Sequence, residues 1–161
     1  MNKLLALAAL ALCAFTAQAQ TYTFPAGWNC GIATSPIYCQ APAANGTSIS
    51  IEANLSWGSS KTPPAVGQTY QLYTVWVMQY VNGVYETSGA WSAGTPGSDV
   101  CYGTITNNGT QPYPYEVTLS CATFAFSDGT VKAVTLDERF GIVKRGYRLY
   151  WTTGGGTVTL N

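Results

Sequence analysis

Apolar and polar side chains alternate residue by residue along much of this 161-residue chain. The segment from Thr47 to Trp57 alternates, with apolar residues at the odd positions from Ile49 onward and polar residues at the even ones, as in a strand with one buried face. No segment shows a sustained 3.6-residue period. A chain with this pattern buries its apolar side chains by aligning strands into sheets that pack on one another.

Turn residues divide the chain into short strands. Asn82-Gly83 separates two β-type runs and predicts a hairpin with a type I′ turn. Gly154-Gly155-Gly156 predicts the tip of a last hairpin, and the charged segment 137–146 fits either a short helical turn or a bent edge strand. These signals predict an all-β fold, an antiparallel β-sandwich of about eight to ten short strands, with a small closed β-barrel as the alternative.

The amino terminus has the three parts of an export signal. Lys3 precedes an apolar run from Leu4 to Phe15, and Ala17-Gln18-Ala19 matches a small-residue cleavage site before Gln20. We therefore expect a signal peptide of bacterial type over residues 1–19, cleaved near Ala19, and a single secreted or periplasmic β domain over 20–161. Since no later apolar run reaches membrane length, no membrane span is predicted.

Four cysteines follow this signal, namely Cys30, Cys39, Cys101 and Cys121. An even number in an exported chain predicts two disulfides, for which three connectivities are open. Spacing along the chain favours Cys30–Cys39 and Cys101–Cys121. We expect no metal and no cofactor, because the cysteines lack CxxC spacing and the chain has no histidine.

The Cys101–Cys121 pair also has a register argument. If residues whose numbers add to 222 face each other in an antiparallel hairpin, Ile105 meets Val117 and Cys101 meets Cys121. Both pairs then share one face of the hairpin, since strand side chains alternate with a period of two.

The composition excludes several classes of function. The chain has 9% charged residues, no histidine and equal numbers of acidic and basic residues, so it lacks the positive charge that nucleic-acid binding requires. It carries no catalytic motif, and we do not expect an enzyme. A basic cluster near the carboxyl end contains Arg139, Lys144, Arg145 and Arg148, and Asp137 and Glu138 are expected to neutralise it in part. The cluster suggests either an anion site or, more simply, protection of an exposed strand edge.

Aromatic residues are the candidate binding groups, since sugar rings stack on Trp and Tyr faces. Trp91 lies in a Gly/Ser loop, Tyr113 and Tyr115 alternate with prolines that should hold them outward, and Trp28 lies close to Cys30. Trp57 and Trp76 are instead predicted to lie in the core.

The predicted function is a non-catalytic binding module outside the cytoplasm, with a glycan or cell-surface polymer as its partner, bound through loop aromatics. A structural or adhesive subunit of a surface assembly is the first alternative, and its support is a Ser/Thr/Gly-rich chain with few reactive groups. An inhibitor of a secreted enzyme, presenting the loop between Cys30 and Cys39, is the second. The sequence does not indicate an oligomeric state.

Overall fold

The computed structural model describes residues 19–33, 36–41, 49–57, 62–94 and 98–161, with the backbone alone described for residues 49–54 and 98. The predicted signal peptide lies outside these residues except for Ala19. Most of the described chain is β-strand, and one short 3-10 helix, η1, spans Ser98–Val100. In the described ranges no helix has the length and hydropathy to cross a membrane.

The described strands form two antiparallel sheets. The first contains β1 (Gln20–Phe24), β2 (Asn29–Ile32), β5 (Thr69–Gln71), β8 (Cys101–Asn107), β9 (Tyr115–Ala125), β10 (Val131–Arg145) and β11 (Arg148–Leu160). The second contains β3 (Ile37–Ala41), β4 (Ile49–Ser56), β6 (Thr74–Val81) and β7 (Val84–Ser92). The strand orders are β1-β11-β10-β9-β8-β5, with β2 also on β11, and β3-β4-β6-β7.

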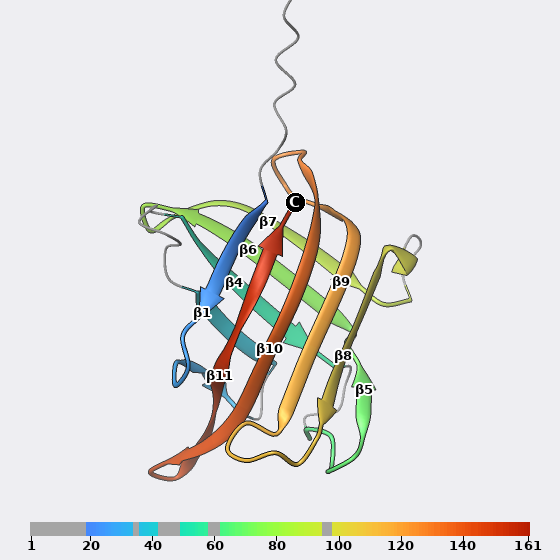
Figure 1. The fold of residues 1–161 in the computed structure, drawn as a ribbon. Coiled ribbons are helices and arrows are strands. Elements are labelled where there is room, and N and C mark those ends of the chain that lie inside the picture. Colours follow the sequence, from blue (N-terminus) through green and yellow to red (C-terminus); the bar gives the residue numbers. More distant parts are fainter. Residues whose placement is uncertain (1–18, 34–35, 42–48, 58–61, 95–97) are drawn as a thin grey trace, which may run out of the picture.

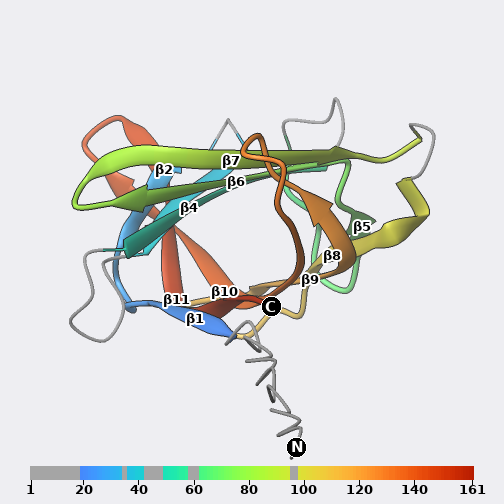
Figure 2. The same ribbon diagram turned by 90° about the horizontal axis from the view of Figure 1, so that it is seen from above.

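The sheets lie face to face with the core between them (Figures 1 and 2). The ladders of the described strands do not close on themselves, so the predicted β-sandwich is confirmed and the alternative closed barrel is not formed. Apolar side chains from both inner faces make one continuous core, with Trp151 fully buried at its centre. Trp57, Tyr115 and Phe140 contact the Trp151 ring edge to face.

The register predicted for the cysteine hairpin is confirmed. Cys101 faces Cys121 and Ile105 faces Val117 between β8 and β9, and the disulfide joins the first pair. The second disulfide, Cys30–Cys39, connects β2 of the first sheet to β3 of the second. Two buried disulfides indicate an oxidising, extracytoplasmic environment.

The predicted turn at Asn82-Gly83 is also confirmed, because both residues have the positive φ of a type I′ turn, 53° and 75°. The prediction for Gly154-Gly155-Gly156 is wrong, since these glycines lie inside β11 rather than at a hairpin tip. A Cβ at Gly156 would collide with the Asp137 carbonyl oxygen of the neighbouring strand. The glycines therefore allow the backbone of β10 and the Tyr113 ring to approach β11 closely.

Segment 137–146 is not a helical turn, and among the described strands only its second half is a bent strand edge, since residues 141–145 pair with β11 alone. Residues 137–145 belong to β10, which pairs with both β9 and β11, with a bulge between Arg139 and Phe140.

The two tryptophans predicted to lie in the core differ: Trp57 is buried as predicted, but Trp76 is 50% exposed. Val75 and Val77 occupy the inner face of β6, and the two-residue alternation places Trp76 on the outer face.

Replacing both cysteines of the β8–β9 hairpin by alanine should lower the free energy of unfolding by about 3 kcal/mol, because the crosslink restricts the unfolded chain over a separation of 20 residues. Urea unfolding of Cys101→Ala/Cys121→Ala measures the loss. The matched control is Thr104→Ala/Thr118→Ala, an exposed cross-strand pair in the same hairpin, which should lose less than about 1 kcal/mol. Equal losses in the two variants would contradict the prediction.

Candidate functional site

A pocket of about 190 Å³ lies between the end of β7 in the second sheet and the β5–β8 edge of the first. Its walls contain two aromatic rings, Trp91 and Tyr102, and two polar side chains, Gln71 and Asp99. The pocket is thus a combination of apolar rings and hydrogen-bonding groups at one edge of the sandwich.

Backbone hydrogen bonds bring these distant segments together. The amide of Leu72 donates to the carbonyl of Gly103, 2.9 Å away, and the amide of Ala93 donates to the carbonyl of Tyr73 at 2.7 Å. Leu72 and Tyr73 connect β5 to β6. The first bond holds the start of this connection on β8, and the second holds the residue after β7 beside its end. Both sheets therefore contribute to the pocket.

Gly103 allows the pocket floor to close. A Cβ at this position would lie 2.7 Å from Leu72 Cδ1 and 3.0 Å from Leu119 Cδ1, so a side chain would displace Leu72 from the floor. Cys101 also contributes to the lining, and its disulfide to Cys121 fixes the start of β8. The floor is consequently apolar and held by a covalent bond.

The two rings differ in exposure. Trp91 lies opposite Val75 on the inner face of β7 and packs partly against the core. Tyr102 projects from β8 and is 63% exposed. A half-buried ring held by the core offers a fixed apolar face, and an exposed tyrosine can turn to cover a ligand. Such faces suit the C–H face of a sugar ring.

Gln71 and Asp99 supply the polar groups. Both are exposed, Gln71 at the end of β5 and Asp99 in η1. An amide offers donors and an acceptor, while a carboxylate accepts from hydroxyl groups and forms charge-assisted hydrogen bonds. At about 190 Å³ the pocket is below the roughly 300–1,000 Å³ of sites for drug-sized ligands, so it matches a single small polar ring.

The structure distributes the four predicted binding aromatics over separate places. Trp91 lines the pocket, whereas Trp28, 46% exposed, lies beside the Cys30–Cys39 disulfide near β2 and β3. Since β3 and β7 are the two outer strands of the second sheet, Trp28 and Trp91 lie at opposite edges of the sandwich.

The two predicted loop tyrosines do not point outward as their flanking prolines suggested. A Cβ on Gly154 would lie 2.6 Å from Tyr113 Cγ, so the Tyr113 ring occupies the space that this glycine leaves on β11. Tyr115 is half-buried, and its ring centroid lies 5.2 Å from that of Trp151. Both rings pack onto the sandwich, because glycines on β11 and the Trp151 ring offer them apolar surfaces.

Sequence reasoning missed Gln71, Asp99 and Tyr102, which supply the polar groups and the second ring of the pocket. The predicted hairpin register places Tyr102 on the face opposite Cys101, which is a signal for its exposure. No comparable signal exists for Gln71 and Asp99, because their proximity depends on the pairing of β5 with β8.

A separate group of exposed aromatics lies on the outer face of the second sheet. Trp76 and Tyr85 are each 50% exposed, and the Tyr80 and Tyr85 rings meet edge to face at 6.1 Å. This face provides exposed rings outside the pocket, including a tryptophan that can serve as a control for Trp91.

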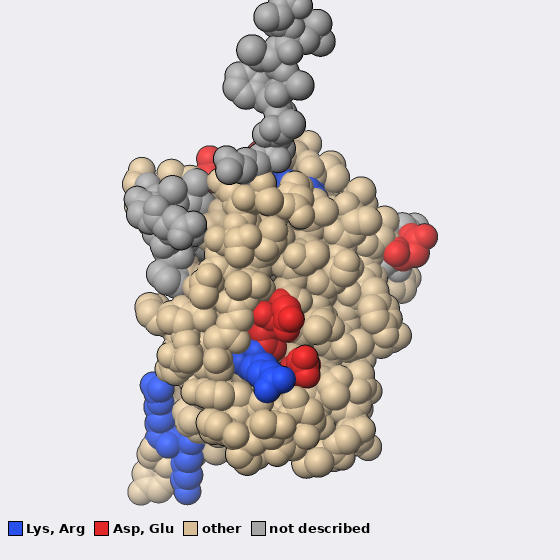
Figure 3. All heavy atoms as spheres, in the orientation of Figure 1, with Lys and Arg blue, Asp and Glu red and all other residues tan. Residues whose placement is uncertain are grey.

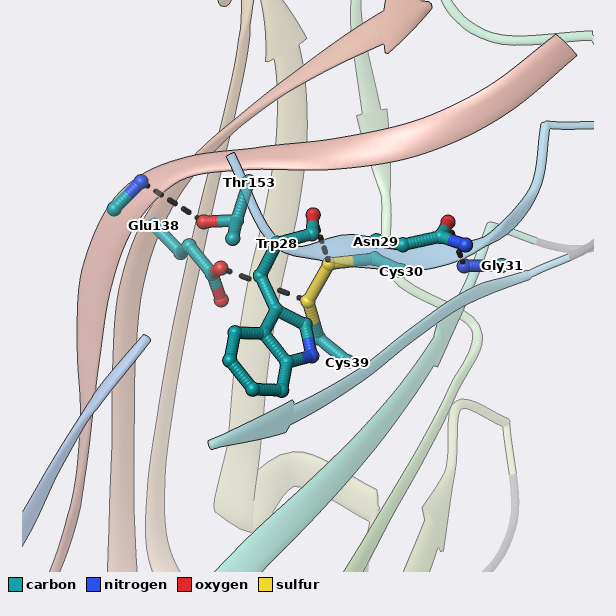
Figure 4. Close-up of a disulfide and its surroundings, with 8 residues drawn as sticks. Trp28, Asn29, Cys30, Gly31, Cys39, Glu138 and Thr153 are labelled. Carbon is teal, nitrogen blue, oxygen red and sulfur yellow. Dashed lines mark hydrogen bonds between the residues drawn. A yellow bond between two sulfur atoms is a disulfide. The ribbon is translucent and has the colours of Figure 1, made fainter. Parts of the chain in front are cut away.

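Glu138 is the most unusual ionisable residue among those described. Its side chain is 1% exposed, its Oε2 has no hydrogen-bond partner within the described residues, and its Oε1 lies 3.9 Å from Cys39 Sγ (Figure 4). A disulfide sulfur carries no hydrogen and cannot donate to the carboxylate. Burial raises the pKa of the Glu138 carboxyl to about 8, and the Thr153 side chain lowers it only in part.

The acidic residue next to Glu138 in the sequence does not share its environment. Asp137 is exposed on the opposite face of β10, and the groups gathered around Glu138 in the described part of the chain are Cys30 and Cys39. Their sulfurs are joined to each other and are not thiolate ligands. The inhibitor hypothesis concerns the loop between these cysteines, of which residues 34–35 lie outside the described residues.

Comparisons with protein-family models, with curated proteins and with solved structures found no match for this chain.

Proposed function

We propose that this chain is a non-catalytic binding module that acts outside the cytoplasm and takes one ring of a neutral glycan into the pocket between β7 and β8. The observation that supports this proposal is the arrangement of Trp91 and Tyr102 with Gln71 and Asp99 around a pocket of about 190 Å³. Apolar ring faces and hydrogen-bonding side chains are the two kinds of group that a sugar requires.

The proposal includes export through a signal peptide over residues 1–19 and release to the periplasm or the exterior. The oxidising environment indicated by the two disulfides agrees with this route. Mass spectrometry of the protein produced in a bacterial host would test it, with Gln20 as the expected first residue.

Alanine at Trp91 should reduce the affinity for a bound glycan by about 5- to 150-fold, since truncating an aromatic residue in a desolvated contact costs about 1–3 kcal/mol. The wild-type protein would first be screened against immobilised neutral and acidic glycans, and the affinity for a ligand so found measured by calorimetry. Asp99→Asn, which retains the shape but removes the charge, should give a smaller loss.

Trp76→Ala is the matched control, because it removes an exposed tryptophan from the outer face of the second sheet. It should leave the affinity unchanged. A loss in Trp76→Ala without a loss in Trp91→Ala would place binding on the outer face and refute the pocket. Failure to bind any glycan, together with self-association in sedimentation experiments, would favour the adhesive or assembly subunit instead.

A further inference from the structure

The tip of the β10–β11 hairpin carries a concentration of positive charge. Lys144, Arg145 and Arg148 lie within five positions, and the whole chain has seven lysines and arginines. Arg145 and Arg148 are directly opposite each other in the ladder. Figure 3 shows basic side chains projecting from the sandwich at the lower left, where Figure 1 shows this hairpin.

The carboxylates expected to neutralise the cluster do not reach it. Glu138 is buried, and Asp137 lies far from the tip, opposite Thr118 and Thr157. Arg139, the fourth residue of the predicted cluster, lies opposite Glu116 on the outer face of the first sheet. Within the described part of the chain, the three cations at the tip have no ion-pair partner, which corrects the expected neutralisation.

The tip also exposes apolar surface. Tyr147 is completely exposed at the apex and Leu149 is 47% exposed. Gly146 precedes Tyr147 with a φ of 61°, and a glycine with positive φ at the first of two central positions is typical of a type II′ turn. A two-residue turn of this kind holds Tyr147 at the end of a ladder whose last pair is Arg145–Arg148.

Edge protection explains only part of this arrangement. The pairing of β10 with β9 ends at Phe140, so cations beyond it do discourage pairing with another chain. Two arginines directly opposite each other, however, destabilise a hairpin. Edge protection also gives no reason for an exposed tyrosine and leucine at the same tip.

We propose that this hairpin tip docks on an anionic membrane surface. The tip would meet the membrane end-on, with Arg145 and Arg148 on one face of the hairpin and Lys144 on the other contacting the phosphate groups of acidic lipids. Tyr147 would enter the interfacial layer, where amphipathic aromatic rings are favoured. A soluble anion would use the charges but not the exposed Tyr147 and Leu149. Charge complementarity and the apolar apex thus select the same partner, and the inference does not depend on the sugar pocket.

Vesicle binding tests this inference. The protein would be sedimented with phosphatidylcholine vesicles that contain or lack phosphatidylglycerol, at low and high salt. We expect binding only to the acidic vesicles, with a decrease as salt screens the charges. Arg145→Glu should weaken binding about 10- to 30-fold, because each basic residue near an acidic membrane contributes roughly 1 kcal/mol.

Arg139→Glu is the matched control, since it makes the same change of charge on the face of the first sheet. Its binding should remain within about twofold of wild type, and Tyr147→Ser should reduce binding about three- to tenfold. Trp91→Ala should bind vesicles normally, which separates this inference from the proposed glycan function.

Arg145→Glu also controls for folding. A glutamate opposite Arg148 replaces a repulsive pair by an attractive one but removes the contact of the Arg145 guanidinium with the Tyr150 ring, so the melting temperature should stay within about 2 °C of wild type while vesicle binding falls. Lys144→Gln, on the other face of the hairpin, provides a second variant that should weaken binding.

Absence of binding to acidic vesicles, equal binding to neutral ones, or equal losses in Arg145→Glu and Arg139→Glu would overturn the proposal. Binding to heparin with no dependence on Tyr147 would overturn it as well.

Discussion

Raising the pH from about 5 to about 8.5 should lower the free energy of unfolding by several kcal/mol, and replacing Glu138 by glutamine should abolish most of this dependence. The reason is that the folded protein holds a proton on Glu138 that the unfolded chain releases. Burial raises the pKa of this carboxyl from its ordinary value of 4.5 to about 8. The contribution of this carboxyl to the free energy of unfolding is therefore fully present below about pH 4.5 and is lost as the pH rises toward 8.

The full shift corresponds to roughly 5 kcal/mol, which is an upper figure because local rearrangement or water entry would relieve part of the cost. Urea unfolding of wild type and Glu138→Gln over this pH range measures it. This pH range lies above the titration of Asp128, because the hydrogen bonds that its carboxylate accepts from Thr130 lower its pKa. It lies below the titration of Tyr22, because burial raises the pKa of that phenol. Asp137→Asn, an exposed neighbour, is the matched control and should retain the wild-type slope. Equal slopes in wild type and Glu138→Gln would contradict the prediction.

Alanine at Trp151 should destabilise the protein by about 3–5 kcal/mol, the range for removing a large aromatic side chain from a core. The ring is completely buried and lies 5.7 Å from Trp57, 5.2 Å from Tyr115 and 6.4 Å from Phe140, measured between ring centroids. Its loss removes three edge-to-face contacts and leaves a cavity between the sheets. Chemical unfolding monitored by circular dichroism gives the change in free energy.

Trp151→Phe retains an aromatic ring and should lose distinctly less stability than Trp151→Ala. Trp76→Ala removes the same side chain from an exposed position and should lose less than about 1 kcal/mol. If Trp151→Ala were no more destabilising than Trp76→Ala, the assignment of Trp151 to the centre of the core would be wrong.

Local sequence rules predicted the elements that depend on neighbouring residues. The two-residue alternation and the turn signals indicated a sandwich, and Asn82-Gly83 forms the expected hairpin turn. The pairing of Cys101 with Cys121 follows from the same alternation, because one short hairpin contains both cysteines and its register determines which side chains meet. Each of these predictions requires only steric rules that act within or between adjacent strands.

The tertiary structure decided the features that depend on strands distant in sequence. The Gly154-Gly155-Gly156 run resembles a flexible tip until β10 and Tyr113 are placed against β11, where a side chain at Gly154 or Gly156 would collide with them. Glu138 is one of several acidic residues in the sequence, and only the junction of the two sheets buries it beneath Cys30–Cys39.

The candidate site divides in the same way. The sequence by itself drew attention to Trp91 because of its aromatic ring, and alternation predicts that Tyr102 points away from the Cys101 side chain. The proximity of both rings to Gln71 and Asp99 was decided by the pairing of β5 with β8 and by the approach of β7 from the other sheet. The physical reason is that alternation fixes the face on which a side chain lies, whereas the packing of whole sheets fixes which faces and edges come together.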